Sequence, residues 1–362
     1  MRPTASIIML PSRGACTPRS MPPGPLATTV GFVARRDSHP AMFKGFAGIA
    51  MGGEPMGFWH VLWPTGLFSN AAVVTAFRIG SAVAVVNAVV GVFVVIRGQA
   101  FSGHALGDVG ATGAAGAYLA GITALWGFLA AGFSSGMAIE SLGHRVRERD
   151  VATGVVLAFM LGLSALFLYL ISALTETSGA PIAILFGSLF TVAPGMTGYV
   201  LGLSLSALLL LGIIFRPLLF SSVTPDVARV RGVSPRLVGL LFMVSLVVAV
   251  EESALVVGAL LSTALLIGPA AIATKLSRQP LTSMALAMAI GVFTTWLGII
   301  LAYDSFLWPP LNRGWPISFF ITSLMLLSYL AVQIASGRQR RSNAATALTD
   351  FGNLSTEREA WW

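Results

Sequence analysis

Long apolar runs, each ended by a charged or proline-containing stretch, fill most of the chain after residue 78. A helix needs roughly 20 mostly apolar residues to cross a bilayer, and runs of this length predict spanning helices. We expect an all-α, polytopic membrane protein with about eight to ten such helices. The predicted spans are 79–96, 101–121, 122–142, 151–174, one ending at 215, 237–250, 253–274, 281–303 and 316–336.

One uncharged stretch is too long for a single crossing. No residue from Thr177 to Phe215 is charged, and a helix rises about 1.5 Å per residue. Gly187 and Pro194 interrupt the stretch. We predict a short half-inserted segment, AILFGSLFTV, followed by a full span that ends at Arg216–Pro217. Non-helical backbone at membrane depth is tolerated only inside protein or along a cavity, so this segment should line a pathway.

Basic residues gather in alternate loops. Cytoplasmic loops carry an excess of Lys and Arg, which predicts that these loops share the cytoplasmic side. Nine crossings satisfy this rule and put the amino terminus outside; a further crossing by residues 67–78 would give ten. The basic positions are Arg97, 143–150, 221–236, Lys275 with Arg278, and 338–341.

Composition supports the membrane interpretation. Of the 362 residues, 56% are hydrophobic and 10% are charged, whereas a soluble domain has about 25% charged residues. The formal charge of +8 comes largely from loop and terminal arginines, and no basic patch interleaved with aromatic residues indicates a nucleic-acid partner. The single cysteine, Cys16, excludes an internal disulfide and a cysteine metal cluster.

Three regions follow from this pattern. Residues 1–66 are rich in Pro and Arg and hold no long apolar run, so we expect a disordered extension. An over-long gene start is the alternative, with Met42, Met51 or Met56 as the true start. Residues 67–336 form the transmembrane domain, and residues 337–362 a cytoplasmic tail.

The segment FSGHALGDVGATGAAGAYL carries the most informative polar residues. His104 and Asp108 are four positions apart, which places both on one face of a helix. Ionisable groups in the membrane cost roughly 2.5–3.5 kcal/mol on insertion scales, and both side chains are ligands for divalent transition metals. A metal-passage pair, a helix-packing hydrogen bond and snorkelling all remain open. Gly110, Gly113 and Gly116 are spaced for close helix contact.

Other polar residues admit two interpretations each. Glu251 and Glu252 fall at a predicted external turn, where they form a candidate outer entrance that attracts cations or else a solvated loop. Asp304 has the same predicted placement and the same two interpretations. Asn87 is expected to hydrogen-bond another helix, and Glu140 to snorkel or pair.

Two catalytic signatures are absent from the sequence. The chain has no GxxxxGK[ST] phosphate loop and no HExxH. P-loop ATP binding is therefore excluded, and we expect no enzymatic activity of this chain itself.

Five blocks, in order, resemble a known family. They are VVGVFVVIRGQAFSGHALGDVGATG, ERDVATGVVLAFMLGLS, ILFGSLFTVAP, RPLLFSSVTPDVARVRGVSPR and VVGALLSTALLIGPAAIATKLSR. From about Leu67 to Ser336 the chain is similar to the permease subunits of ABC-type zinc, manganese and iron importers, the ABC-3 metal permeases. The resemblance implies a multi-pass permease of the cytoplasmic membrane, with a second permease chain, ATP-binding ABC subunits and an extracytoplasmic metal-binding protein as partners. Divalent metal is then the substrate, and no cofactor is permanently bound.

The resemblance also implies residue roles. An acid and a histidine four apart line the metal path of the family, and they fall on His104 and Asp108. Family members read Gly-Asp-Ala-Leu-Ser-His or Gly-His-Ala-Leu-Ser-His, whereas this chain reads Gly-His-Ala-Leu-Gly-Asp. The helix that contacts the ATPase falls on Pro225 to Gly232, with Asp226 and Arg229 facing the partner.

Two alternatives stay open. An ion-coupled secondary metal transporter needs no ATPase, and Glu251, Glu252 and Asp108 would relay protons. A membrane scaffold or enzyme without transport is the other. An imidazole and a carboxylate suit Zn, Mn and Fe alike, so these ligands leave the metal open.

Overall fold

The computed structural model describes residues 70–142, 146–174, 187, 189–191, 195–223, 228, 230, 232, 234–307 and 314–336. The chain divides into two units, Met1–Met51 and Gly52–Trp362, and every described residue belongs to the second. The predicted extension 1–66 and tail 337–362 lie outside the described residues.

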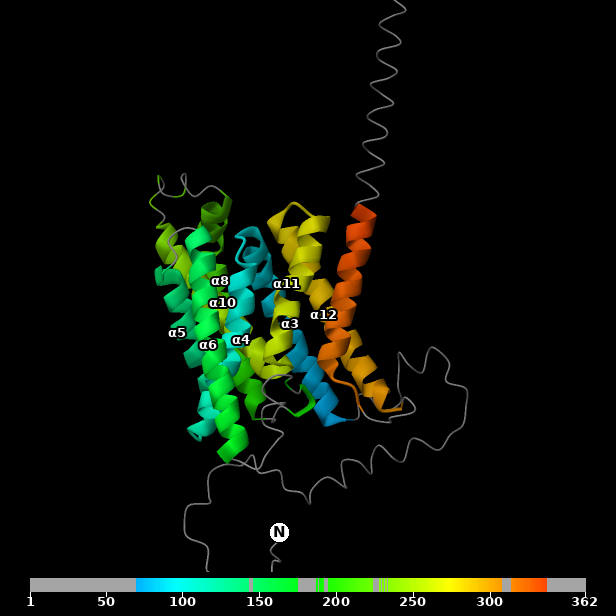
Figure 1. The fold of residues 1–362 in the computed structure, drawn as a ribbon. Helices are drawn as coiled ribbons and strands as arrows, with labels where there is room; N and C mark the ends of the chain where they lie inside the picture. The colour runs from blue at the N-terminus through cyan, green and yellow to red at the C-terminus, as the bar shows by residue number, and fades with distance from the viewer. Residues whose placement is uncertain are drawn as a thin grey trace, which may run out of the picture. The chain divides into compact units, whose positions relative to one another are not determined.

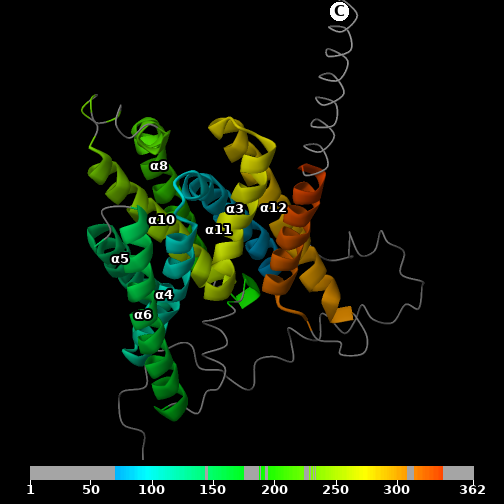
Figure 2. The same cartoon turned by 45° about the horizontal axis from the view of Figure 1, so that its top comes forward.

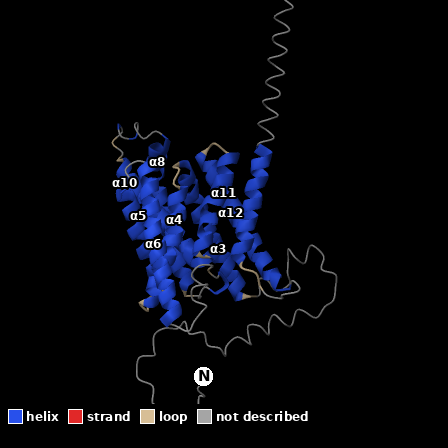
Figure 3. Cartoon of the chain, in the orientation of Figure 1, coloured by secondary structure: helices blue, strands red, loops and turns tan. Residues whose placement is uncertain are grey.

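The described part is helical and, within these ranges, contains no strand (Figure 3). Among the described helices, six are long and apolar enough to cross a membrane: α3, α6, α8, α10, α12 and Ile317–Ser336. The predicted all-α, polytopic fold is confirmed. In chain order the elements are α3 (Ala71–Ile96), α4 (Ala100–Leu119), α5 (Ala124–Leu142), α6 (Val146–Leu174), η2 (Leu189–Thr191), α8 (Met196–Val223), α10 (Pro235–Val257), α11 (Ala259–Leu276), α12 (Pro280–Asp304), η3 (Ser305–Leu307) and helix Ile317–Ser336.

Helix α3 begins earlier than predicted. The Asn70 side chain caps it, because its Oδ1 accepts a hydrogen bond from the Ala72 amide at 3.0 Å. Such a cap satisfies one of the free amides of the first turn. Residues 71–78 therefore extend the first span, and the alternative with a tenth crossing at 67–78 is wrong over these residues.

Helix α8 ends later than predicted. It continues through Arg216–Pro217 to Val223, with Pro217 inside the helix. Proline removes one backbone hydrogen bond but need not end a membrane helix when neighbouring groups compensate. Leu218, directly after the proline, is fully buried. Its carbonyl accepts hydrogen bonds from the hydroxyls of Ser221 and Ser222.

The break between α10 and α11 falls at Gly258, beyond the predicted position near Glu251–Glu252. Gly258 has φ 104°, a conformation that glycine adopts without a Cβ clash. A Cβ on Gly187 would lie 2.3 Å from the Gly258 amide nitrogen, so the chain before η2 packs against this break. Of the predicted half-inserted segment, the described residues form a single 3-10 turn, η2, with Leu189 buried.

Helices α3 and α4 lie in the middle of the bundle (Figures 1 and 2). Helix α3 contacts α8, α10, α11 and α12, and α4 contacts α5, α6, α10 and α11. Phe93 of α3 packs edge-to-face on Phe215 of α8 and Phe242 of α10. Asn87 donates to the Ala249 carbonyl of α10 at 3.3 Å, which confirms the predicted bond between helices.

Glycines let α4 approach its neighbours closely. A Cβ on Gly113 would lie 2.0 Å from the Gly127 carbonyl oxygen of α5, and a Cβ on Gly127 would lie 2.2 Å from that of Gly113. A Cβ on Gly110 would lie 1.9 Å from Oε2 of Glu251 on α10. The predicted close contacts of this segment are confirmed, and they fix α4 against both helices.

Alanine at Gly110 should destabilise the bundle. The new methyl would overlap the Glu251 carboxyl, and overpacking a filled site costs about 1–3 kcal/mol. Gly162→Ala is the matched control, because no described atom lies within 4 Å of a Cβ at that position on α6. Thermal unfolding in detergent should show a lower Tm for Gly110→Ala and no loss for Gly162→Ala.

The second substitution Glu251→Ala removes the overlapping carboxyl and should raise the Tm of Gly110→Ala. Equal Tm values for Gly110→Ala and the wild type would contradict the close packing of α4 on α10.

Candidate functional site

His104 and Asp108 lie on one face of α4, as their spacing predicts. The His104 Nε2 atom is 3.7 Å from Oδ2 of Asp108, which is within ion-pair range but too long for a hydrogen bond. The His104 side chain is 47% exposed and that of Asp108 is 16% exposed. The two groups are therefore adjacent without being locked together, and a cation has access to both.

Thr263 of α11 is hydrogen-bonded to the other ring nitrogen of the imidazole. The His104 Nδ1 atom lies 3.0 Å from the Thr263 hydroxyl oxygen. A hydrogen bond at one ring nitrogen fixes the orientation of the ring, and it fixes the tautomer when that nitrogen carries the proton. With Nδ1 donating to Thr263, Nε2 has its lone pair free on the side of Asp108. This arrangement presents one nitrogen ligand and one oxygen ligand to the same space.

Sequence reasoning missed Thr263. It lies 159 positions from His104, and no local spacing connects the two residues. The available signal was a threonine within an apolar run next to Ser262.

Gly107 allows α11 to come this close. A Cβ on Gly107 would lie 2.5 Å from the Ser262 hydroxyl oxygen, nearer than real contacts allow. In the resembling motif a serine occupies this position. The glycine and Ser262 therefore accommodate each other at the point where α11 brings Thr263 to the imidazole.

The pair does not form a complete metal site within the described part of one chain. Among the described residues, no group of three or more His, Cys, Asp or Glu side chains is placed to hold a metal ion. Two ligands are also too few for tight coordination, which takes four in structural zinc sites. The pair can bind a cation weakly, or tightly once further ligands reach it.

Glu251 and Glu252 do not lie in an external turn, and that prediction is wrong. Both are in α10 and each is 1% exposed. The Glu251 carboxyl sits between Gly110 of α4 and Gly132 of α5, and neither of its oxygens has a hydrogen-bond partner among the described residues. Helices α4, α5 and α10, rather than water, therefore surround this side chain.

Glu252 points toward a different helix. Its Oε1 accepts a hydrogen bond from the Ser204 hydroxyl of α8, while Oε2 has no partner among the described residues. Asp304, the last residue of α12, is 2% exposed, so its predicted solvated setting is also wrong. A part for these three carboxylates in an outer entrance stays a prediction.

Of the predicted ATPase contact, residues 225–232, the structure describes Ala228, Val230 and Gly232. Pro225, Asp226 and Arg229 lie outside the described residues. Gly232 is exposed and has φ 78°, and a Cβ at this position would meet no described atom within 4 Å. This is the geometry of a turn at the surface.

These features define a class of protein: a multi-pass helical membrane protein with an exposed histidine beside a part-buried aspartate on a central helix. Residues 69–331 match the model of the ABC 3 transport family. The chain belongs to this family of transport permeases, and it is a multi-pass protein of the cytoplasmic membrane.

Curated relatives agree with the family. The chain is 27% identical over 238 residues to the manganese import system permease protein ScaB of Streptococcus parasanguinis, covering 66% of this chain and 82% of that protein. It is 31% identical over 221 residues to the manganese transport system membrane protein MntC of Halalkalibacterium halodurans, covering 60% and 74%.

The fold is similar to that of a solved structure. The structure of PsaBC from Streptococcus pneumoniae in complex with a Fab matches with a TM-score of 0.61 at 24% identity, covering 73% of this chain and 93% of that chain. At this identity the likeness concerns the fold.

Ser204→Ala should destabilise the packing of α8 on α10. The substitution leaves the buried Glu252 carboxyl without its hydroxyl donor, and an unsatisfied buried polar group costs about 1–3 kcal/mol. Ser206→Ala is the control on the same helix, because the exposed Ser206 hydroxyl bonds the Leu203 carbonyl of its own helix. Thermal unfolding in detergent should separate the two variants, and identical Tm values would argue against a stabilising Ser204–Glu252 bond.

Proposed function

We propose that this chain is the transmembrane permease subunit of an ATP-binding-cassette importer that carries divalent transition metal into the cytoplasm. His104 and Asp108 are the groups that the passing ion touches. The observation that carries the proposal is the pairing, on α4 within the bundle, of an exposed His104 side chain with a part-buried Asp108 side chain.

The exposure has a physical consequence. An imidazole and a carboxylate facing hydrocarbon are costly, so ionisable residues in membranes face a bundle interior or a water-filled cavity. The surface beside α4 and α11 is therefore best explained as one that another protein chain covers or that water fills. A second copy of the permease would supply both a cover and a second pair of ligands.

The coordination suits a transported ion. One imidazole and one carboxylate per chain give four ligands across two chains, of types that Zn, Mn and Fe accept. A path needs binding that is reversible, and ligands shared between two chains separate when the chains move apart. Manganese is the ion to test first, because the relatives ScaB and MntC are named for manganese import or transport.

Energy must come from other subunits. The sequence has no phosphate loop, so we infer that separate ATP-binding subunits drive transport and that an extracytoplasmic protein delivers the metal. The segment from Pro225 to Gly232 is the proposed ATPase contact, with Asp226 and Arg229 facing the partner.

A proton-coupled mechanism without an ATPase is less well supported. It would pass protons between Asp108 and Glu251, but Glu251 contacts α4 at Gly110. Residues two apart on a helix point about 200° apart. The Asp108 side chain therefore leaves α4 on nearly the opposite face from the one that Glu251 contacts. The helix itself lies between the two carboxyls.

His104→Ala and Asp108→Ala should each abolish metal uptake. Each variant removes one of the two ligands, and even groups that only orient a ligand change metal affinity by about 10–100-fold. Uptake of Mn²⁺, Zn²⁺ and Fe²⁺ into a deletion strain is the measurement, with membrane levels of the variant as the check on assembly. Asp150→Asn, an exposed acid on α6, is the control and should transport normally. Normal uptake by both ligand variants would refute the proposed path.

Exchanging the two ligands should preserve part of the activity. The double variant His104→Asp with Asp108→His keeps both ligand types on one face of α4 and restores the histidine to the position it takes in Gly-Asp-Ala-Leu-Ser-His. It loses the contact between His104 and Thr263. We expect uptake about 10–100-fold below wild type but above either alanine variant, because the loss is that of an orienting group. Uptake no better than that of the alanine variants would show that the ligand order itself is essential.

A further inference from the structure

A polar cluster lies at the end of the bundle where α3 turns into α4. The turn consists of Arg97, Gly98 and Gln99, and it is closed by backbone hydrogen bonds from Arg97 to Phe93 and from Gln99 to Val94, both at 2.9 Å. Gly98 has φ 66°, which permits so short a turn. Helix α4 begins at the next residue, so the orientation of the turn sets the orientation of α4.

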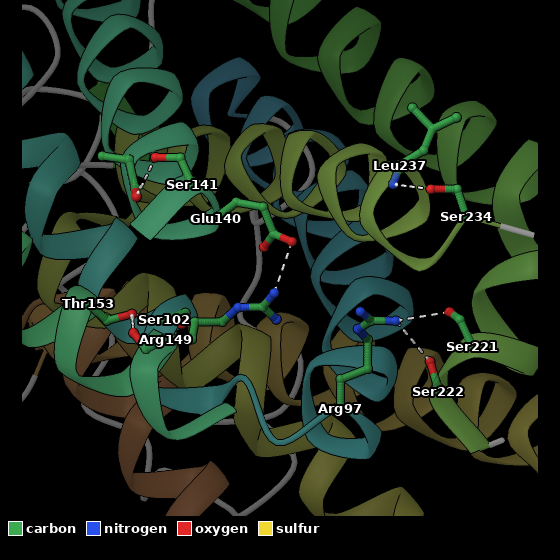
Figure 4. Close-up of polar contacts among 11 residues, drawn as sticks. Arg97, Ser102, Glu140, Ser141, Arg149, Thr153, Ser221, Ser222, Ser234 and Leu237 are labelled. Atoms are coloured by element: carbon green, nitrogen blue, oxygen red, sulfur yellow. Dashed lines mark hydrogen bonds and ion pairs between the residues drawn. The ribbon is translucent and has the colours of Figure 1, made fainter. Parts of the chain in front are cut away.

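Arg97 joins this turn to two other helices. Its Nη1 atom donates to the Ser221 hydroxyl at 3.3 Å and to the Ser222 hydroxyl at 3.2 Å, both near the end of α8 (Figure 4). The guanidinium carbon lies 5.4 Å from the centre of the Phe242 ring on α10. A planar guanidinium can donate to two acceptors while its face rests on an aromatic ring, which a lysine ammonium does less well.

A neighbouring ion pair supports the cluster. Arg149 of α6 donates to Oε1 of Glu140 on α5 at 2.9 Å, as the predicted pairing of Glu140 requires (Figure 4). Both Glu140 Oε1 and Arg97 Nη2 lie near Gly239 of α10, at 2.8 and 3.8 Å from the position of a Cβ there. Burial lowers the pKa of Arg97, the charge of Arg149 lowers it further, and Glu140 acts in the opposite direction.

The cluster connects two parts of the chain that transport must link. Helix α8 leads directly into the segment proposed to contact the ATPase, and Ser221 and Ser222 are among its last residues. On the other side, Arg97 precedes α4, which carries His104 and Asp108. Aliphatic contacts between helices permit sliding, whereas hydrogen bonds from one guanidinium fix a relative position.

We propose that Arg97 is a positioning residue that couples the end of α8 to α4, so that a shift of α8 imposed by the ATP-binding subunit moves His104 and Asp108. The proposal rests on the proposed function. It assigns Arg97 no contact with the metal. Its role is to transmit a displacement of α8 to α4. Arg97 on one side of the link, and Ser221 and Ser222 on the other, can be substituted separately.

The test uses the full permease co-purified with its ATP-binding subunit and placed in lipid vesicles. Arg97→Gln and the double variant Ser221→Ala/Ser222→Ala each break the link from one side. We expect Mn²⁺ binding by the permease and ATP hydrolysis to persist, while the Mn²⁺ transported per ATP hydrolysed falls by about tenfold, within the range of energetic coupling between sites. Ser141→Ala is the control, because that exposed hydroxyl bonds the Ala138 carbonyl of its own helix.

Two further variants separate coupling from simple destabilisation. Arg97→Lys keeps the charge and one donor and should recover part of the transport ratio. Arg97→Gln combined with the serine double variant should lose no more than either alone, because all three side chains belong to one link. A merely structural role would instead lower assembly and metal binding together and would give additive losses.

The outcomes distinguish this proposal from the proposed function. An unchanged transport ratio in both the Arg97→Gln and the serine variants overturns the coupling role. If Arg97→Gln fails to assemble, the serine variant decides, since it leaves the charge of Arg97 in place. Failure of the wild-type complex to bind or transport Mn²⁺, Zn²⁺ or Fe²⁺ would instead overturn the proposed function.

Discussion

Hydrocarbon offers no hydrogen bonds, and this constraint organises the polar residues of the bundle. Asn87 reaches the Ala249 carbonyl, and Ser245 reaches the Ala207 carbonyl at 3.1 Å. Each of these bonds joins two helices and lies in the interior. His104 departs from this pattern, since its ring is bonded to Thr263 but remains 47% exposed, with the part-buried Asp108 beside it. In the proposed function, water or another protein chain covers this surface.

Much of the fold could be predicted from the sequence because membrane spans depend on local composition. Length, hydropathy and basic loops placed α4, α5, α6 and α12 to within a few residues. The ends that were missed depend on tertiary contacts. Helix α8 continues past Pro217, and Leu218 directly after it is buried in the bundle. The α10–α11 break lies at Gly258 because the backbone near Gly187 packs against it.

The site divides in the same way. The pairing of His104 with Asp108 follows from helical periodicity, so the sequence alone could reveal it. Thr263 could not be found this way, because its contact with His104 exists only when α11 folds onto α4. The burial of Glu251 was missed for a related reason. A glutamate in a sequence usually indicates a solvent-exposed position. The buried space for Glu251, however, is created by Gly110 and Gly132 on two other helices.

Close packing at its glycines makes α4 move as a rigid body with its neighbours. Gly113 fixes it against α5 through backbone contact, and Gly107 fixes it against Ser262 of α11. Helices packed at backbone distance cannot rotate independently, because any rotation drives a Cα or carbonyl into its neighbour. His104 and Asp108 can therefore be displaced only together with the helices that grip α4. The turn that begins α4 is the end from which such a displacement can be applied, and Arg97 is the side chain that ties that turn to α8.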